Sequence, residues 1–118
     1  MAMQPYQGSC HCGAIHFTFE AEPITKGIRC NCSFCSKRGT MMHLVPGEKF
    51  KIDAKEGALN FYQFGKKQAK HYFCRNCGIH SFSESPRWPG QYIVNLACVD
   101  GVDTFALETK IFDGKNLL

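Results

Sequence analysis

Residues 9–13 read Ser-Cys-His-Cys-Gly, and residues 74–78 read Cys-Arg-Asn-Cys-Gly. The second stretch is a CxxC turn, whose following glycine accepts a left-handed backbone and leaves amide groups free to donate to the sulfurs. The first is a CxC pair, which reaches one metal ion only if the backbone curls, as Gly13 permits. Neither pair completes a tetrahedron alone. The spacing predicts a closed, structural zinc site with four ligands: Cys10, Cys12, Cys74 and Cys77.

A second motif, residues 30–35, reads Cys-Asn-Cys-Ser-Phe-Cys. Three cysteines this close together can surround one ion and leave its fourth position to water, substrate or a distant side chain, as in catalytic zinc sites. Three thiolates and one zinc ion carry about one net negative charge, so such a site suits thiol chemistry better than water activation. We therefore predict two zinc ions per chain, with an open one held by Cys30, Cys32 and Cys35.

The cysteine spacing leaves other arrangements open. One of the middle cysteines can join the CxxC pair, which would leave the CxC pair for the other site. A histidine would close the second site and make both sites structural, and the candidates are His43, His71 and His80. Packing is the more common role for His71 and His80, as it is for His11. A disulfide framework and a rubredoxin-like iron site are weaker alternatives.

Short runs of aromatic and β-branched residues predict an all-β chain. The clearest run is residues 15–20, where Ile15, Phe17 and Phe19 point one way and polar neighbours point the other. Further strands are expected at residues 41–45, 59–64, 70–73, 92–99 and 104–112. Asp100-Gly101 predicts a hairpin turn between the last two runs, and residues 83–91 predict a surface loop. Only residues 33–38 favour a helical turn, so we expect small antiparallel sheets and little helix.

Length and composition predict a single domain over residues 1–118. The net charge of +4 is spread along the chain, which is typical of a solvated surface and makes nucleic acid an unlikely partner. The opening MAMQPYQGS lacks the features of a signal peptide, and no run is long enough to span a membrane, so we expect a cytoplasmic protein. Cys98 is expected to be a buried hydrophobe, and edge strands leave a homodimer open.

Four stretches of sequence, in this order, closely resemble the glutathione-dependent formaldehyde-activating enzyme family, which includes centromere protein V: SCHCGAIHF, CNCSFC, HYFCRNCG and IVNLACVD. The resemblance extends from Gly8 to about Phe112. It implies an all-β, tent-like zinc-binding fold. The structural-zinc ligands of the family match Cys10, Cys12, Cys74 and Cys77. The catalytic-zinc ligands match Cys30, Cys32 and Cys35.

The resemblance also implies an activity. In the family's best-known reaction, glutathione adds to formaldehyde to give S-hydroxymethylglutathione, which classes the enzyme as a carbon–sulfur lyase. The expected partners are therefore a small thiol such as glutathione and a small aldehyde, and three cations could receive the carboxylates: Arg29, Lys37 and Arg38. The alternative is a non-catalytic zinc module that binds protein or nucleic acid, as the centromere relative suggests.

Overall fold

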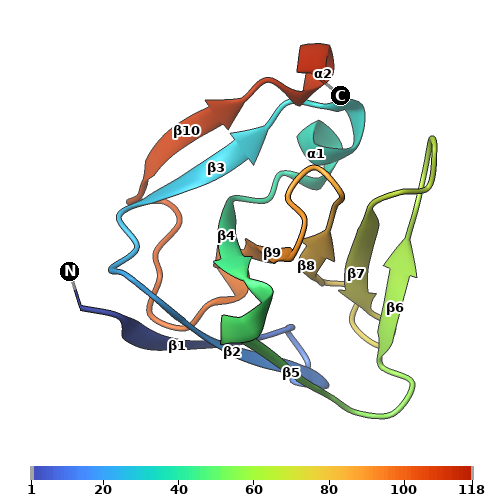
Figure 1. The fold of residues 1–118 in the computed structure, drawn as a ribbon. Coiled ribbons are helices and arrows are strands. Elements are labelled where there is room, and N and C mark those ends of the chain that lie inside the picture. The colour runs from blue at the N-terminus through green and yellow to red at the C-terminus, as the bar shows by residue number, and fades with distance from the viewer. Residues whose placement is uncertain (1, 118) are drawn as a thin grey trace.

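The structure, a computed structural model, describes residues 2–117. It is nearly all-β, with two sheets and short helices (Figure 1). The strands are β1 (Gln4–Ser9), β2 (Ile15–Ala21), β3 (Lys26–Cys30), β4 (Met42–Pro46), β5 (Phe50–Ala54), β6 (Leu59–Tyr62), β7 (Lys70–Cys74), β8 (His80–Glu84), β9 (Gln91–Asn95) and β10 (Glu108–Phe112). The helices are α1 (Ser33–Arg38), α2 (Gly114–Leu117) and the 3-10 turns η1 (Gly47–Lys49) and η2 (Leu96–Cys98). The expected fold class is confirmed.

The smaller sheet has the strand order β1-β2-β5 and is antiparallel throughout. Its central strand, β2, alternates between buried and exposed side chains along its whole length. Ile15, Phe17 and Phe19 lie inside, at no more than 3% exposure, while the polar residues between them face solvent. The half-buried strand that the sequence predicted is therefore confirmed, and it supplies much of the core.

The larger sheet has the order β10-β3-β4-β9-β8-β7-β6 and curves around one side of the molecule (Figure 1). Aromatic rings from both sheets fill the space between them. Phe50 of the smaller sheet lies 5.2 Å from Phe82 and 4.6 Å from Tyr92 of the larger one, measured between ring centroids. Phe17 packs against both Phe50 and Phe82, so one aromatic cluster joins the two sheets.

The opposite face of the larger sheet carries α1. Strand register places Leu44, Ile93, Ser83 and His71 side by side on β4, β9, β8 and β7. Residues in register share a face, whereas Phe82, one position from Ser83, faces the main core. Leu44 and Ile93 pack in a second, smaller apolar cluster with the cysteines around α1. The larger sheet thus separates the main core from a site beneath this helix.

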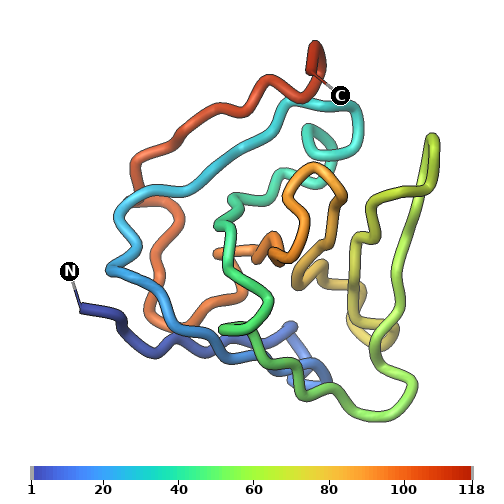
Figure 2. The backbone as a smooth tube through the Cα atoms, in the orientation of Figure 1, coloured from blue at the N-terminus to red at the C-terminus, as the bar shows by residue number. Residues whose placement is uncertain are grey.

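One predicted connection is wrong. Asp100–Gly101 forms a turn, but β9 and β10 do not pair, and β10 instead runs parallel to β3 at the edge of the sheet. Figure 2 shows this last segment, in red, returning beside β3, in cyan. The reason is that the chain leaves β9 to contact the smaller sheet, where the Asp100 amide donates to the Gln7 carbonyl at 2.8 Å and Val99 bridges to Gly8.

Other boundaries differ from the sequence-based expectation. β9 ends at Asn95, because the Asn95 side chain accepts from the Ala97 amide at 3.1 Å and starts η2. Ser83 and Glu84, predicted as loop, belong to β8, and residues 85–90 then form the expected loop. Strands β1, β3, β5 and β8 were not among the expected strands. None of the helices found between residues 2 and 117 is both long and apolar enough to cross a membrane.

Candidate metal centres

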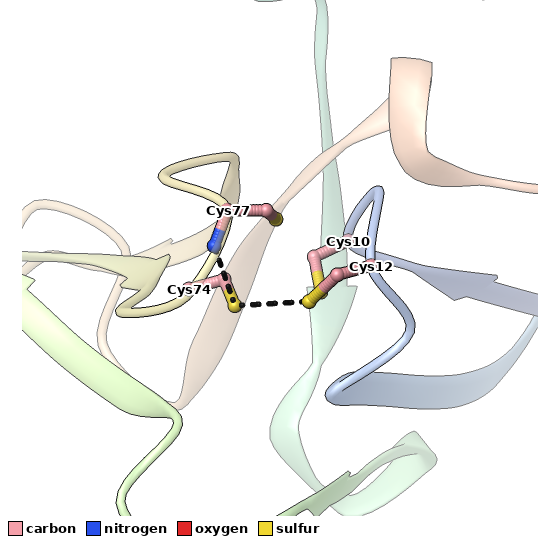
Figure 3. Close-up of side chains that lie close together, drawn as sticks. All are labelled: Cys10, Cys12, Cys74 and Cys77. Carbon is pink, nitrogen blue, oxygen red and sulfur yellow. Dashed lines mark hydrogen bonds between the residues drawn. The ribbon is translucent and has the colours of Figure 1, made fainter.

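The first cysteine cluster joins the loop after β1 to the turn between β7 and β8. Figure 3 shows the four side chains converging from these two loops. Their sulfur atoms all lie within 4.8 Å of one another, with Cys12 Sγ 3.7 Å from Cys10 Sγ and 3.6 Å from Cys74 Sγ. Ligand sulfurs around tetrahedral zinc are separated by about 3.7 Å. The structure thus brings together the predicted set Cys10, Cys12, Cys74 and Cys77, in a geometry that fits a tetrahedral metal.

Each pair in this cluster sits in a tight turn closed by backbone hydrogen bonds. The Cys10 carbonyl accepts from the Gly13 amide at 3.2 Å, and the Cys74 carbonyl accepts from the Gly78 amide at 2.8 Å. The two glycines have φ of +83° and +80°, a left-handed conformation that costs glycine little. The Cys77 amide also donates to Cys74 Sγ at 3.4 Å, as the dashed line in Figure 3 marks. Such donors stabilise the thiolate form that binds a metal.

The first cluster lies at the surface. Cys10 and Cys74 are buried, but Cys12 is exposed. The Asn76 side chain, by hydrogen bonding, lowers the pKa of Cys12 to about 6, whereas burial raises the pKa of Cys74 to about 11. A bound cation favours the thiolate form of every ligand. Four thiolates would fill a tetrahedral coordination shell and leave no position for a substrate.

The second cysteine cluster lies where β3 ends and α1 begins. The sulfur atoms of Cys30, Cys32 and Cys35 are all within 4.8 Å of one another. Cys32 is the N-cap of α1, and its sulfur accepts from the Cys35 amide at 3.3 Å. The first turn of the helix therefore directs Cys35 back toward the other two. Cys30 and Cys32 are each only 9% exposed, because Met42 and Ile93 pack against them.

The second cluster offers three ligands and no fourth. Among residues 2–117, no histidine or carboxylate joins the three sulfurs within the same 4.8 Å limit. The structure therefore does not support a closed second site completed by His43, His71 or His80. It also does not support the alternative pairing, because the CxxC turn meets the CxC pair. All eight cysteines are free thiols, so there is no disulfide framework.

Arg38, in the last turn of α1, points into the second cluster. Its Nη2 lies 3.2 Å from Cys35 Sγ, and its Nη1 lies 2.9 Å from His80 Nε2. The other two candidate cations are placed differently: Arg29 donates to the Gly39 carbonyl at 2.9 Å, and Lys37 is exposed. The contact of Arg38 with the cluster was missed from the sequence, although Cys35 and Arg38 have the i, i+3 spacing of helix neighbours.

Two histidines flank Arg38 on the sheet. Ser83 Oγ lies 2.9 Å from His71 Nδ1 and 2.8 Å from His80 Nε2, so the serine links the two rings. Burial, together with the positive charge of Arg38, lowers the pKa of His71 to about 4 and that of His80 to about 2. Both rings are therefore neutral at pH 7. Burial raises the pKa of Cys35 to about 12, and the charge of Arg38 opposes this increase.

Cys98 lies outside both clusters. It is half-buried, and its sulfur lies 3.5 Å from the His80 carbonyl oxygen. Burial raises its pKa to about 11. A neutral, half-buried thiol is consistent with the packing role that the sequence predicted.

The structure defines the class of this protein as a small, nearly all-β protein with two cysteine clusters, one of four sulfurs and one of three, that could each hold a metal ion. The family model described as glutathione-dependent formaldehyde-activating enzyme matches residues 5–115, and the chain belongs to this family. Among solved structures, the chain is similar to a Rhodobacter sphaeroides protein with 33% sequence identity and a TM-score of 0.78. That match covers 88% of this chain and 99% of the other.

Proposed function

We propose that this protein is a zinc-dependent carbon–sulfur lyase that joins a small thiol such as glutathione to a small aldehyde such as formaldehyde. The observation that carries the proposal is the three-sulfur cluster, which has no fourth ligand among residues 2–117. Membership in the formaldehyde-activating family supports the same reaction class. Nothing in the reaction requires an oxidant or a reductant.

Two zinc ions per chain fit the donor sets, because thiolates are ligands that zinc prefers. We assign the structural ion to Cys10, Cys12, Cys74 and Cys77. We assign the catalytic ion to Cys30, Cys32 and Cys35. Zinc bound at the second site would lower the pKa of a thiol that reaches the open position.

The residues of the chain orient and shield the reacting groups. The helix cap holds Cys32 and Cys35 together, and packing by Met42 and Ile93 limits access of water from the sheet side. The substrate sulfur attacks the aldehyde carbon, so that a C–S bond forms while the π bond of the carbonyl group breaks. The proton lost by the sulfur ends on the aldehyde oxygen. Holding both reactants side by side supplies most of the rate gain. Exposed Lys37 is the cation best placed on α1 to receive a substrate carboxylate.

Exchange NMR tests this proposal. Glutathione, formaldehyde and their adduct are mixed at equilibrium. Their rate of exchange is measured in three samples: without protein, with the wild-type protein and with Cys32→Ser. We expect faster exchange with the wild-type protein only. No acceleration across several thiols would overturn the lyase proposal. A non-catalytic zinc module would then be the better description, and a salt titration against generic DNA would test its nucleic-acid form.

A further inference from the structure

The guanidinium group of Arg38 is held in one place by groups from four elements. Nη2 donates to Cys35 Sγ and approaches Met42 Sδ at 3.5 Å. Nη1 lies 2.9 Å from His80 Nε2 and 3.4 Å from both His71 Nδ1 and Ser83 Oγ. The ring of Phe34 lies beneath it, 4.7 Å from the guanidinium carbon to the ring centroid. These contacts come from α1, β4 and the β7–β8 hairpin, so the position of the cation depends on the assembled sheet.

Arg38 is a half-buried cation, with its Nε atom fully buried, and it has no carboxylate partner among residues 2–117. Its hydrogen-bond partners there are sulfur atoms, imidazole nitrogens and a hydroxyl group, and its Nε is buried with no partner in that part of the chain. A buried charge is costly unless an opposite charge compensates it. The group in contact with Arg38 that can become anionic is the Cys35 sulfur, which belongs to the three-sulfur cluster.

The two cysteine clusters differ in the way their charge can be compensated. Four thiolates and a divalent ion carry two net negative charges, but the first cluster lies at the surface, where exposed Cys12 is in contact with water. Three thiolates and a divalent ion carry one, and the second cluster lies beneath α1, with Cys30 and Cys32 nearly buried. Water solvates the first charge. The second needs a counter-ion inside the protein, and Arg38 is in contact with it.

We propose that Arg38 is a positioning residue for the second metal site, where its guanidinium neutralises the three-thiolate complex and fixes the Cys35 sulfur. This inference rests on the metal site of the proposed function. Arginine can only donate, so His80 Nε2 must accept, which places the ring proton on Nδ1. Ser83 Oγ lies within hydrogen-bond distance of both histidine rings and fixes their orientation. The two rings and the hydroxyl group thus position the cation without cancelling its charge.

Cobalt titration tests the role of Arg38 without requiring turnover. Metal-free wild-type protein, Arg38→Met and Arg38→Lys are titrated with Co²⁺ in competition with a chelator, and the thiolate-to-cobalt absorption bands are recorded. Arg29→Met is the matched control, because Arg29 is a nearby arginine that donates only to a backbone carbonyl. Cys32→Ser, with the second site removed, identifies the spectrum of the first site.

We expect Arg38→Met to weaken the second site about 10- to 100-fold, the usual effect of losing a group that supports a metal ligand. The first site and the Arg29→Met control should remain unchanged. Arg38→Lys should fall between the wild type and Arg38→Met, because it keeps the charge but not the fork of donors. In Arg38→Met, the thiolate-to-cobalt absorption band of the second site should shift to lower energy than in the wild type, because the Cys35 sulfur loses a hydrogen-bond donor.

An unchanged cobalt affinity in Arg38→Met would overturn the inference. Equal cobalt affinities of Arg38→Met and Arg38→Lys would also overturn it, because a side chain that only fills space needs no charge. If Arg38→Met does not fold, Arg38→Lys decides, and equal affinity to the wild type would overturn the inference. A wild-type protein that binds only one cobalt ion would instead contradict the second metal site of the proposed function. The two failures are therefore distinguishable.

Discussion

Cys12 Sγ lies 3.6 Å from Cys74 Sγ, although the two residues are 62 positions apart in the chain. The contact joins the loop that follows β1 to the turn of the β7–β8 hairpin, and hence the smaller sheet to the larger one. Closing a loop of this length costs conformational entropy in the folding chain. A metal at this position would offset that cost, and the cysteine variants below depend on this relationship.

Substituting Cys74 should remove the fold along with the metal. In Cys74→Ser the first site loses a buried ligand, and the binding energy of a structural zinc is on the order of 10 kcal/mol. We expect no cooperative thermal transition by circular dichroism and loss of metal from both sites. Cys98→Ser is the control, because Cys98 belongs to neither cluster, and its cost should be about 1 kcal/mol. A Cys74→Ser protein that melts like this control would contradict a structural role.

Substituting Cys32 should remove one metal and leave the fold. Serine is a good N-cap, so Cys32→Ser keeps the cap of α1 while replacing a metal ligand. The metal content should therefore fall from two ions per chain to one. The variant should also no longer accelerate the exchange between glutathione, formaldehyde and their adduct. The melting temperature should fall far less than in Cys74→Ser. Equal destabilisation of the two variants would show that both clusters are structural.

The two metals should leave the protein at different rates. The second cluster has three protein ligands and the first has four, so a chelator should extract the second metal first. Release followed with a metal-sensitive dye should show two phases, and Cys32→Ser should lack the faster one. Circular dichroism should change only during the slower phase. If exposure of Cys12 controls release, the order reverses and the fold is lost in the first phase.

Gly8 should tolerate no side chain. A Cβ at this position would lie 2.5 Å from the Cys98 carbonyl oxygen and 2.5 Å from the ring of Phe17, and neither a backbone atom nor a fully packed ring moves readily. We expect Gly8→Ala to lose about 1–3 kcal/mol of unfolding free energy in urea. Gln7→Ala is the control, because Gln7 is exposed and uses only its backbone carbonyl to pair with Asp100. Equal stability of the two variants would contradict the close packing at Gly8.

The two cysteine clusters could be predicted because ligand spacing is a local property of the sequence. The alternation of Ile15, Phe17 and Phe19 is local too, and β2 matches it. The parallel pairing of β10 with β3 could not be predicted, because it depends on contacts far apart in the chain. β8 was missed because Ser81 and Ser83 are polar residues that the fold buries, and hydroxyl groups of this kind usually indicate a loop.

The contacts of Arg38 could not be predicted from the sequence for the same reason. Its position three residues after Cys35 was visible in the sequence, but its other partners were not. His80 and Ser83 come from β8, and only the strand order brings that hairpin beneath α1. The sequence therefore indicated a solvent-facing cation that could meet a substrate. The structure instead places this side chain inward, against the cluster.

β9 lies between β4 and β8 in the sheet but follows both in the sequence. As the chain is synthesised, every cysteine of the two clusters is made before β9 begins at Gln91. The central strand must therefore enter a gap between neighbours that already exist, and a metal joining Cys12 to Cys74 at that stage would hold those neighbours close together. If the first cluster binds its metal as we propose, the yield of folded protein should depend on the metal available during translation.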